Sequence, residues 1–546
     1  MNRPRYVSSL HLLFAMVLSA SAWPAAGEGR EPADFAIVGG LLHDGGRQPA
    51  RIADLVVRGD RIVAVGAGVA AGYDAKRVVD ARGFVVAPGF IDPHTHPNSY
   101  IRSDDPLERR NLPWLFQGVT TIATGVDGGG TPHVARQRAW FEQHGVGTNV
   151  VPYVGFGPVR REVLGAASRA PDAQELARME ALVAQGMCEG AVGFSTGLFY
   201  APQSFASTGE VVALARQAAR RGGLYDTHQR DESTYGIGLL ASTREAIDIG
   251  RRAGLPVHFA HLKALGTDVH GQAEALVELI DAARANGQRV TADQYPWLAS
   301  GTRLSSALLP RWAQDGGRPA LLLRLADPAQ TARIATEMTQ NLRRRGGADA
   351  LLLTAADRPW SGLTLAQVAQ QWQVGAPEAA MRIIRGDGLP ESRAADSVAS
   401  FNMDEDDVRL LMAQPWMVTS SDGSNGHPRQ YASFPEKYVR YVREQGVLDL
   451  DAFIHRSTGL TARILGLEQR GRLQPGAYAD VLVFDPEAFA PGADYFSPRV
   501  LSRGVQVLLV NGVPAIDGGR ATEALAGRHL RHAPPAGTCP PANSTR

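Results

Sequence analysis

The sequence predicts an α/β protein built on a (β/α)8 barrel of the TIM type, in which eight parallel strands alternate with helices. Three observations predict this fold. Eight short apolar runs lie between residues 89 and 423, several of them are separated by segments of helical periodicity, and polar side chains gather where the runs end. A chain of 546 residues is long enough for such a barrel with further parts attached.

The composition is that of an ordinary globular protein, with 44% hydrophobic and 20% charged residues. A formal net charge of +1 provides no field that would attract a polyanion. We therefore exclude nucleic acid as a partner and expect a small-molecule ligand.

The first residues predict an export signal. Arg3 and Arg5 precede the apolar run LLFAMVLSA, and small residues follow as far as Ala22 or Ala26, either of which suits cleavage. The run is shorter than a transmembrane helix, and no later segment reaches that length. We expect residues 1–26 to be a signal peptide, the mature protein to be periplasmic or secreted, and no segment to span a membrane.

Short β-rich runs flank the barrel on both sides. Residues 30–88 contain FAIVGGLLHDG, ADLVVRGDRIVAVG and RVVDARGFVVAP, separated by Gly and Asp turns. Residues 471–528 contain GRLQPGAYADVLVFDP and VQVLLVNGVPAIDGG, which have the same texture. Because chain ends often lie close together, we expect these two segments to pair into one small β-sandwich.

The barrel is expected to occupy residues 89–470. Its eight strands are, in order, GFIDPHTH, GVTTIATG, TNVVPYVG, GAVGFSTG, GLYDTHQR, LPVHFAHLK, RVTADQYP and WMVTSSDG. Helix-period segments such as AEALVELIDAARANG at residues 273–287 lie between them. The stretch from about residue 302 to 410 is largely helical in period and precedes the eighth strand, so we expect an inserted lid subdomain there.

Only two cysteines are present, Cys188 and Cys539. We expect no disulfide framework, and we interpret Cys188 as a small buried apolar side chain. Residues 529–546 are rich in Pro and small residues, which predicts a disordered tail.

Side chains that can bind a metal ion follow five of the predicted strands. Functional groups of a (β/α)8 barrel lie at the carboxyl ends of its strands. The first strand ends in His94 and His96, and an extended strand projects alternate side chains to the same face. The second, fifth, sixth and eighth strands end in Asp127, His228, His261 and Asp422.

This set of nitrogen and oxygen ligands suits Zn²⁺, with Mn²⁺, Fe²⁺ or Co²⁺ as substitutes. A zinc ion with an open coordination position lowers the pKa of bound water to about 7. A neighbouring carboxylate can take the proton of that water and pass it to a leaving nitrogen, and Asp422 is placed for this role. The sequence therefore predicts a hydrolytic metal site.

Two nearby residues, Lys263 and Glu232, have both a functional and a structural interpretation, and a third, His258, has a structural one. Lys263, two residues after His261, either polarises a substrate carbonyl or lies on the surface. Glu232, four residues after His228, either supports the site or begins a helix. His258 is expected to be a buried structural histidine.

The chain resembles the D-aminoacylase family of N-acyl-D-amino-acid deacylases, within the amidohydrolase superfamily. The resemblance extends from about residue 35 to 515 and is carried by VVAPGFIDPHTH, THQRDE, HLKALG, SSDGSNGHPRQYASFPE and GRLQPGAYADVLVFDP. It implies a metal-dependent barrel, a β-sandwich from both chain ends and a lid before the last strand. It also implies hydrolysis of the linear amide of N-acyl-D-amino acids to a carboxylate and a free D-amino acid.

The resemblance assigns metal-binding roles. His228 and His261 match the tight metal ligands of the family, and His94 and His96 match the pair at its weaker second site. Asp422 matches the catalytic aspartate, which we also count among the metal ligands.

The resemblance also assigns residues that meet the substrate. Lys263 matches a lysine near the reacting centre, and Arg429 matches an arginine that binds the substrate carboxylate. Tyr295 and Ser195 match positions that line the substrate.

One position departs from the family. Its members typically have a cysteine in a GNCG-like turn after the second strand, whereas this chain has GVDG with Asp127. An oxygen ligand shifts the metal preference from zinc toward Mn²⁺ or Fe²⁺. A single ion and a pair of ions bridged by Asp127 both stay open.

Two other functions stay open. The same fold could hydrolyse cyclic amides, imides or dipeptides, and a ring substrate without a carboxylate would leave Arg429 without a partner. A non-catalytic periplasmic protein that binds a metal or a ligand is the alternative from another class, although Asp422 would then have no use. The sequence leaves open the side-chain and acyl-chain preferences, the selectivity for D over L, and the oligomeric state.

Overall fold

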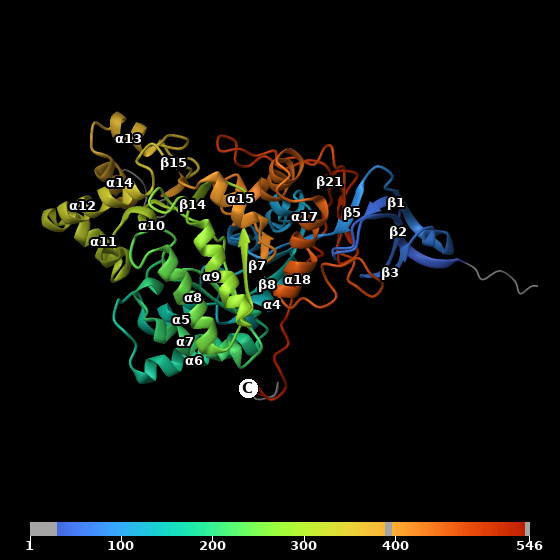
Figure 1. The fold of residues 1–546 in the computed structure, drawn as a ribbon, viewed down its shortest axis with the longest axis horizontal. Coiled ribbons are helices and arrows are strands. Elements are labelled where there is room, and N and C mark those ends of the chain that lie inside the picture. The colour runs from blue at the N-terminus through green and yellow to red at the C-terminus, as the bar shows by residue number, and fades with distance from the viewer. Residues whose placement is uncertain (1–29, 388–395, 541–546) are drawn as a thin grey trace, which may run out of the picture.

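The structure is a computed structural model that describes residues 30–387 and 396–540. The expected signal peptide lies outside the described residues. Figure 1 shows the chain as a central α/β part with a β-sheet on one side and a mainly helical insertion on the other. Within the described ranges, no helix is both long and apolar enough to cross a membrane.

Short parallel strands form the centre of the α/β part, in two sheets. The smaller sheet has the order β6 (Phe90–Asp92), β7 (Val119–Thr124) and β8 (Asn149–Pro152). The larger sheet has the order β17 (Met417–Thr419), β13 (Val290–Gln294), β12 (Val257–Phe259), β11 (Leu224–His228), β10 (Gly193–Gly197) and β9 (Val154–Gly155). All eight expected strands form, and the third is interrupted into β8 and β9.

The two parallel sheets meet at both of their edges. Only Tyr153 separates β8 from β9, so the chain passes directly from one sheet to the other. On the opposite side, the backbone nitrogen of Asp422 donates to the carbonyl oxygen of His94 at 2.9 Å, and Thr95 pairs with Gly423 in parallel. The ends of β6 and β17 therefore lie side by side.

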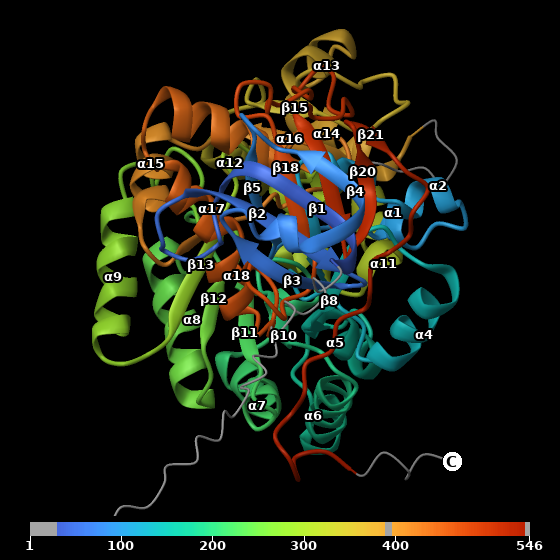
Figure 2. The same ribbon diagram turned by 90° about the vertical axis from the view of Figure 1, so that its right-hand side faces the viewer.

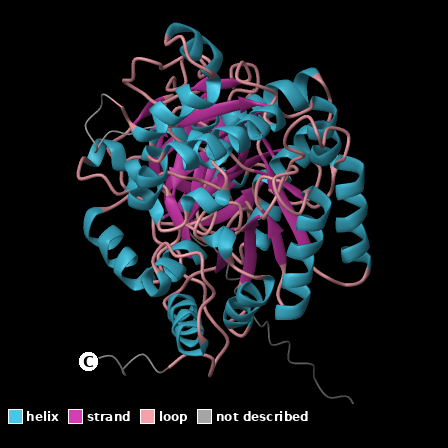
Figure 3. Cartoon of the chain, turned by 90° about the vertical axis from the view of Figure 1, so that its left-hand side faces the viewer, coloured by secondary structure: helices cyan, strands magenta, loops and turns pink. Residues whose placement is uncertain are grey.

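Helices cover the outside of these strands, as Figure 3 shows. Their bounds are α4 (Val134–His144), α5 (Phe156–Leu164), α6 (Ala173–Cys188), α7 (Thr208–Ala219), α8 (Leu239–Ala253), α9 (Ala273–Ala285), α15 (Glu405–Ala413), α16 (Arg429–Glu436), α17 (Leu450–Ser457) and α18 (Gly459–Ile464). In α8, Leu239, Ala246 and Ile249 point to the same core, because residues three or four apart share a helix face. The helix ends at Gly254, whose φ of 80° permits the left-handed turn that stops it.

The two chain ends form one nine-stranded sheet, which faces the viewer in Figure 2. Its strands are β1 (Glu31–Leu42), β2 (Arg51–Arg58), β3 (Arg61–Gly66), β4 (Tyr73–Asp80), β5 (Val85–Pro88), β18 (Val481–Phe484), β19 (Val505–Val510), β20 (Val513–Asp517) and β21 (Arg520–Ala521). The two ends meet where β5 pairs antiparallel with β18, with Pro88 opposite Val481. The segments at residues 30–88 and 471–528 thus pair with each other.

The insertion between β13 and β17 has its own hydrophobic core, which includes Leu304, Met338 and Ile383. Its helices are α10 (Leu304–Leu308), α11 (Gly317–Ala326), α12 (Pro328–Arg344), α13 (Leu365–Gln371) and α14 (Ala376–Arg385). It also contains an antiparallel sheet of β14 (Ala299–Arg303), β16 (Ser397–Phe401) and β15 (Leu351–Leu353). The prediction of a largely helical insertion therefore missed this sheet, because its short strands show too little alternation of apolar and polar residues to be recognised.

Two expectations were wrong: that Cys188 is only a small buried apolar side chain, and that residues 529–540 are disordered, while residues 541–546 of the expected tail lie outside the described residues. Cys188 and Cys539 form a disulfide, which closes a separation of 351 residues. Residues up to 540 follow the surface, with the nitrogens of Leu530 and His532 donating to the carbonyl oxygens of Val150 and Gly190. A Pro-rich composition disfavours helices and strands, but the backbone of such a segment can still form other hydrogen bonds. A disulfide between cysteines so far apart in the sequence has no local sequence signal.

Candidate active site

A cavity of about 510 Å³ opens at the carboxyl ends of the parallel strands. Eight of the ten residues assigned from the sequence line it: His96, Asp127, His228, His261, Lys263, Tyr295, Asp422 and Arg429. His94 is fully buried directly behind this surface, in contact distance of Asp127 and Asp422. The carboxyl ends of the strands thus bring together residues that are up to 335 positions apart in the sequence.

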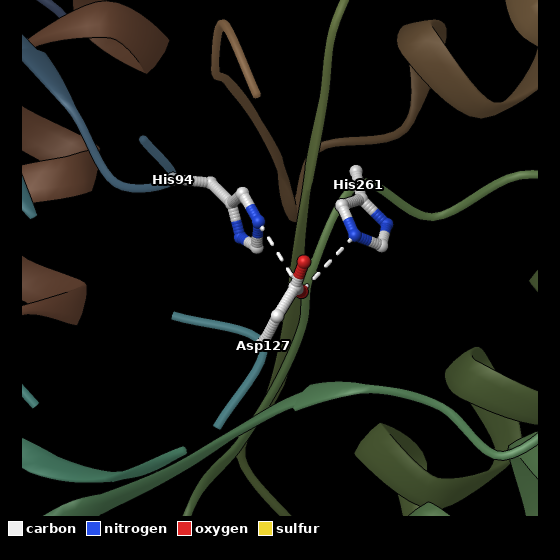
Figure 4. Close-up of side chains that lie close together, drawn as sticks. All are labelled: His94, Asp127 and His261. Atoms are coloured by element: carbon white, nitrogen blue, oxygen red, sulfur yellow. Dashed lines mark ion pairs between the residues drawn. The ribbon is translucent and has the colours of Figure 1, made fainter. Parts of the chain in front are cut away.

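Asp127 lies between histidines from two different strands, as Figure 4 shows. Its Oδ1 is 3.4 Å from Nε2 of His94, which follows β6, and 3.3 Å from Nε2 of His261, which follows β12. Both Asp127 and His261 have positive φ angles, of 52° and 34°. Such left-handed turns directly after a strand redirect a side chain toward the strand ends, and strain of this kind gathers at functional sites.

The other oxygen of Asp127 faces a second group. Its Oδ2 is 3.4 Å from Nε2 of His96, and the same nitrogen is 3.2 Å from Oδ1 of Asp422. Nε2 of His94 is 3.7 Å from that Asp422 oxygen. The carboxylate of Asp127 therefore connects a His94–His261 group with a His96–Asp422 group.

A third group is formed by His228, Glu232 and His261. Nδ1 of His228 is 2.9 Å from Nε2 of His261 and 3.7 Å from Oδ1 of Asp127. Burial lowers the pKa of His228 to about 3, so its imidazole is neutral and carries a free lone pair at neutral pH.

These residues fit a bound metal ion. Among the described residues, Nε2 of His94, Nε2 of His228 and Oδ1 of Asp127 are buried without a hydrogen-bond partner. Leaving polar atoms buried and unpaired is costly, and a divalent cation would satisfy the lone pairs of His94 Nε2 and Asp127 Oδ1, which lie 3.4 Å apart. Imidazole nitrogen and carboxylate oxygen are suitable ligands for zinc and for the neighbouring divalent ions.

The surface interpretation of Lys263 was wrong. Its Nζ is buried, donates to Oε1 of Glu232 at 2.7 Å and lies 2.7 Å from Nδ1 of His261. Burial alone would raise the pKa of Glu232, but Lys263 and the neighbouring histidines hold it below its usual range. Glu232 therefore supports the site as an ionised partner of Lys263, and it does not begin a helix.

Asp422 and Arg429 are held together at the wall of the cavity. Nη1 of Arg429 donates to Oδ2 of Asp422 at 2.6 Å, and its Nη2 donates to the carbonyl oxygen of Gly301 at 3.1 Å and to Oγ of Ser424 at 3.0 Å. A Cβ atom on Gly301 would lie 2.8 Å from that Nη2, so a side chain at this position would displace the guanidinium group.

Ser195 is not on the wall of the cavity. It lies inside β10, two residues before the end of the strand, and is fully buried. Its hydroxyl donates to Oδ2 of Asp226 at 2.6 Å and accepts from the nitrogen of Gly128 at 3.0 Å. Ser195 therefore supports the turn that carries Asp127 and does not reach the place expected of a residue that lines the substrate.

His258 is a buried structural histidine, as expected. Its Nε2 is 3.0 Å from Oδ2 of Asp293, and its Nδ1 is 2.8 Å from Oγ1 of Thr291. It makes no contribution to the wall of the cavity.

Sequence reasoning missed several residues that line the cavity. They include Tyr200 from the loop after β10 and Ser300, Arg303 and Arg345 from the insertion. The expectation that functional side chains follow the barrel strands does not extend to residues of an insertion. A lone arginine after an amphipathic helix carries no signal that would separate it from a surface residue.

The protein has an α/β fold in which histidines and carboxylates gather at the ends of parallel strands. This combination is that of a metal-dependent amidohydrolase. Comparisons with known proteins agree. The model of the amidohydrolase family matches residues 156–515. D-aminoacylase from Alcaligenes xylosoxydans xylosoxydans is 33% identical over 530 residues, which cover 92% of this chain and 98% of that protein.

Two solved structures are similar over 92% of this chain and their whole length. A D-aminoacylase studied for the role of its binuclear metal centre matches with a TM-score of 0.76 and 30% identity. The N-acyl-D-glutamate deacylase of Bordetella bronchiseptica, in complex with zinc and a phosphonate inhibitor that mimics the tetrahedral intermediate, matches with a TM-score of 0.77 and 32% identity. The chain belongs to the amidohydrolase family and, within it, to the D-aminoacylase family of N-acyl-D-amino-acid deacylases.

Proposed function

We propose that the protein is a metal-dependent hydrolase that cleaves the amide bond of N-acyl-D-amino acids and releases a carboxylate and a free D-amino acid. The observation that carries this proposal is the position of Asp422. Its buried carboxylate lies 3.2 Å from His96 of the histidine–carboxylate cluster and also lines the cavity. A general base at this place has a use only if a bound substrate reacts there.

The cluster supports one or two metal ions. His94, His96, Asp127, His228, His261 and Asp422 would hold them, and Asp127 can be shared because its two oxygens face different groups. A divalent ion such as zinc supplies a polarised substrate carbonyl and a water nucleophile at neutral pH. Zinc is supported by the zinc complex of the N-acyl-D-glutamate deacylase, and Mn²⁺, Fe²⁺ and Co²⁺ are substitutes.

Asp422 acts first as a base and then as an acid. It accepts a proton from the attacking water, whose oxygen forms a bond to the acyl carbon. It then donates that proton to the amide nitrogen as the carbon–nitrogen bond breaks, so the products are a carboxylate and an amine. Arg429 keeps one oxygen of Asp422 occupied and thereby fixes the direction of the other.

Lys263 and Tyr295 supply donors to the bound substrate. The Nζ of Lys263 lies on the cavity wall and is within 2.7 Å of Glu232 Oε1 and of Nδ1 and the carbonyl oxygen of His261, so it would exchange one of its contacts with His261 to donate to the oxygen that becomes negative in the reaction. The hydroxyl of Tyr295 donates a weak hydrogen bond to Sδ of Met403 at 3.6 Å, and a substrate carboxylate would replace this sulfur as the stronger acceptor. Arg429 has a buried Nε without a partner in the described residues, and it would share this carboxylate.

We also propose a closed barrel, a lid and a β-sandwich for this chain. We infer that the two parallel sheets are one closed (β/α)8 barrel, which is supported by the shared path of β8 and β9 and by the contact of Asp422 with His94. The insertion would act as a lid, since Ser300, Thr302 and Arg345 reach the cavity from it. The nine-stranded sheet would correspond to the small β-sandwich.

We also propose that the protein is exported to the periplasm or secreted. The apolar run near its N-terminus supports this, as does the disulfide between Cys188 and Cys539, because disulfides persist in oxidising compartments. Fractionation of expressing cells with N-terminal sequencing of the mature protein tests it. Full-length protein confined to the cytoplasm would contradict it.

Dependence on metal tests the enzymatic proposal. Protein treated with a chelator should lose the release of amino acid from N-acetyl-D-methionine, and added Zn²⁺ should restore it. A release that survives complete removal of metal would contradict the proposed chemistry.

A further inference from the structure

His94 has a ring nitrogen that the metal cluster does not use. Its side chain is fully buried, and neither of its ring nitrogens has a hydrogen-bond partner in the described parts of the chain. Nε2 faces the carboxylates of Asp127 and Asp422, so a metal ion would bind this nitrogen. A metal-bound imidazole is neutral and keeps its one proton on the other nitrogen, Nδ1. A buried N–H group of this kind needs an acceptor.

The acceptor that faces Nδ1 is a carboxylate from another strand. Oδ2 of Asp293, in β13, lies 4.0 Å from Nδ1 of His94. This separation is longer than a hydrogen bond, and a shortening of about 1 Å would form one. Both side chains are fully buried, so bulk water does not compete for either group.

Asp293 is held in place by β12 and by the turn that follows it. Its Oδ1 accepts from the backbone nitrogen of His261 at 3.0 Å, and its backbone oxygen accepts from the nitrogen of Leu262 at 2.9 Å. Its Oδ2 accepts from Nε2 of His258 at 3.0 Å. The ring of His258 is oriented in turn by Thr291, whose Oγ1 lies 2.8 Å from Nδ1. The carboxylate therefore has a fixed place beneath the cluster.

The same carboxylate supports a second histidine of the cluster. His261 has a φ of 34°, a left-handed conformation that is costly for a residue with a side chain. The hydrogen bond from its backbone nitrogen to Oδ1 of Asp293 stabilises this turn. His94 follows a strand of the smaller parallel sheet and His261 follows a strand of the larger one. Asp293 therefore connects the two sheets where they share the cluster.

We propose that Asp293 is a positioning residue for metal binding, which accepts the Nδ1 proton of His94 when Nε2 binds a metal ion and which holds the turn of His261. A carboxylate that accepts the second N–H of a metal-bound histidine fixes the orientation of the ring and makes the coordinating nitrogen more basic. This inference rests on the proposed metal-dependent function. It concerns the affinity for the ion, which is measured without substrate.

Asp293→Asn tests this role. The amide oxygen can still accept from the backbone nitrogen of His261, but the amide NH2 group then faces His94 and His258, which both donate to the carboxylate. We expect the affinity for Zn²⁺ to fall about 10- to 100-fold. Competition with a chelating indicator dye measures the affinity, and circular dichroism of the metal-free protein shows whether the variant is folded.

Asp226→Asn is the matched control. Asp226 is equally buried in β11, and its Oδ2 accepts from the hydroxyl of Ser195 at 2.6 Å. An asparagine oxygen can accept the same hydrogen bond, so this variant removes a charge at a similar depth but keeps the contact. The affinity for Zn²⁺ should change less than about 3-fold, well below the effect expected at Asp293.

A proton resonance reports the inferred hydrogen bond directly. In wild-type protein labelled with ¹⁵N-histidine, loading with Zn²⁺ should produce a strongly downfield ¹H signal from Nδ1–H of His94. A hydrogen bond to a carboxylate deshields this proton and slows its exchange with water. His94→Gln should lack the signal, which assigns it. The wild-type spectrum decides the inference if Asp293→Asn does not fold.

Three results would overturn the inference. They are an unchanged affinity for Zn²⁺ in folded Asp293→Asn, an equal loss in Asp293→Asn and Asp226→Asn, and a wild type without a zinc-dependent Nδ1–H signal from His94. A wild type that binds Zn²⁺ but cleaves no N-acyl amino acid would contradict the proposed function alone, because the metal titrations and the proton spectrum still decide the role of Asp293. A wild type that binds no Zn²⁺ would overturn both.

Discussion

Arg429 and Asp422 form a buried ion pair in which the two oxygens of the carboxylate have different neighbours. Oδ2 accepts from Nη1 of Arg429 at 2.6 Å, and Oδ1 faces Nε2 of His96 at 3.2 Å. Burial by itself would raise the pKa of Asp422, but the charge of Arg429 and the nearby histidines hold it well below its usual range. Arg429 thus keeps the base ionised and aims its free oxygen at the cluster.

Replacement of this base should remove turnover and leave the fold intact. Asp422→Asn keeps the shape of the side chain but cannot accept a proton, so we expect kcat to fall by about 100- to 10,000-fold. Steady-state kinetics on N-acetyl-D-methionine measure this, and circular dichroism and metal content show whether the variant is folded and loaded. A folded, metal-loaded variant with unchanged kcat would exclude Asp422 as the base.

Asp127 should control both the retention and the identity of the metal. Asp127→Ala removes the carboxylate shared by the histidine groups, so we expect loss of bound metal and of activity. Asp127→Cys should retain metal and shift the preference toward zinc over Mn²⁺, because a thiolate is the softer ligand. Elemental analysis after loading with equal concentrations of the two ions measures this, and an Asp127→Ala protein with full metal content would refute the shared-ligand role.

The buried side chain of Lys437 should make the free energy of unfolding depend on pH. It is fully buried, its Nζ has no hydrogen-bond partner in the described residues, and burial lowers its pKa from 10.5 to about 7. Between pH 7 and 10 the unfolded chain therefore holds a proton that the folded chain lacks, so folding becomes more favourable as the pH rises. The advantage of Lys437→Met over the wild type should shrink by up to about 1.4 kcal/mol per pH unit in this window.

Denaturant unfolding at pH 7, 8 and 9 measures that difference. Lys76→Met is the control, because Lys76 is exposed and paired with Asp34. Its difference from the wild type should vary much less over the same range. A constant difference for Lys437→Met would show that the lysine is charged in the folded protein.

The disulfide should stabilise the protein without affecting its chemistry. Cys188 ends α6 just before β10 begins, so the disulfide lies at the amino ends of the strands, opposite the cavity. Cys539→Ser should lower the free energy of unfolding by roughly 2–5 kcal/mol and leave kcat/KM unchanged at 25 °C. Thermal unfolding with and without reductant measures this. The wild type should respond to reductant and the variant should not, and an equal response of both would contradict the account.

The sequence was most informative where local patterns and the fold agree. His94, Asp127, His228, His261 and Asp422 each follow a short apolar run, and parallel strands bring their carboxyl ends to the same side of the sheet. The pairing of the two chain ends was also predictable, because both segments have strand and turn patterns and their unpaired edges require partners.

Other features depend on tertiary contacts that have no local signal. Ser195 matched a substrate-lining position, but it lies two residues below the strand end and faces Asp226. Arg345 reaches the cavity from an insertion whose path the strand pattern does not set. The partner of Cys188 is 351 residues away, in a segment whose composition suggested disorder.

The central claim is that the chain hydrolyses the linear amide of N-acyl-D-amino acids through its cluster and Asp422. The most direct test compares the release of free amino acid from N-acetyl-D-methionine, its L enantiomer and a hydantoin by the zinc-loaded mature protein. We predict release from the D enantiomer, little from the other two, and none above background from Asp422→Asn. Hydrolysis of the hydantoin in preference to both linear compounds, or no release from any of them by a metal-loaded protein, would contradict the claim.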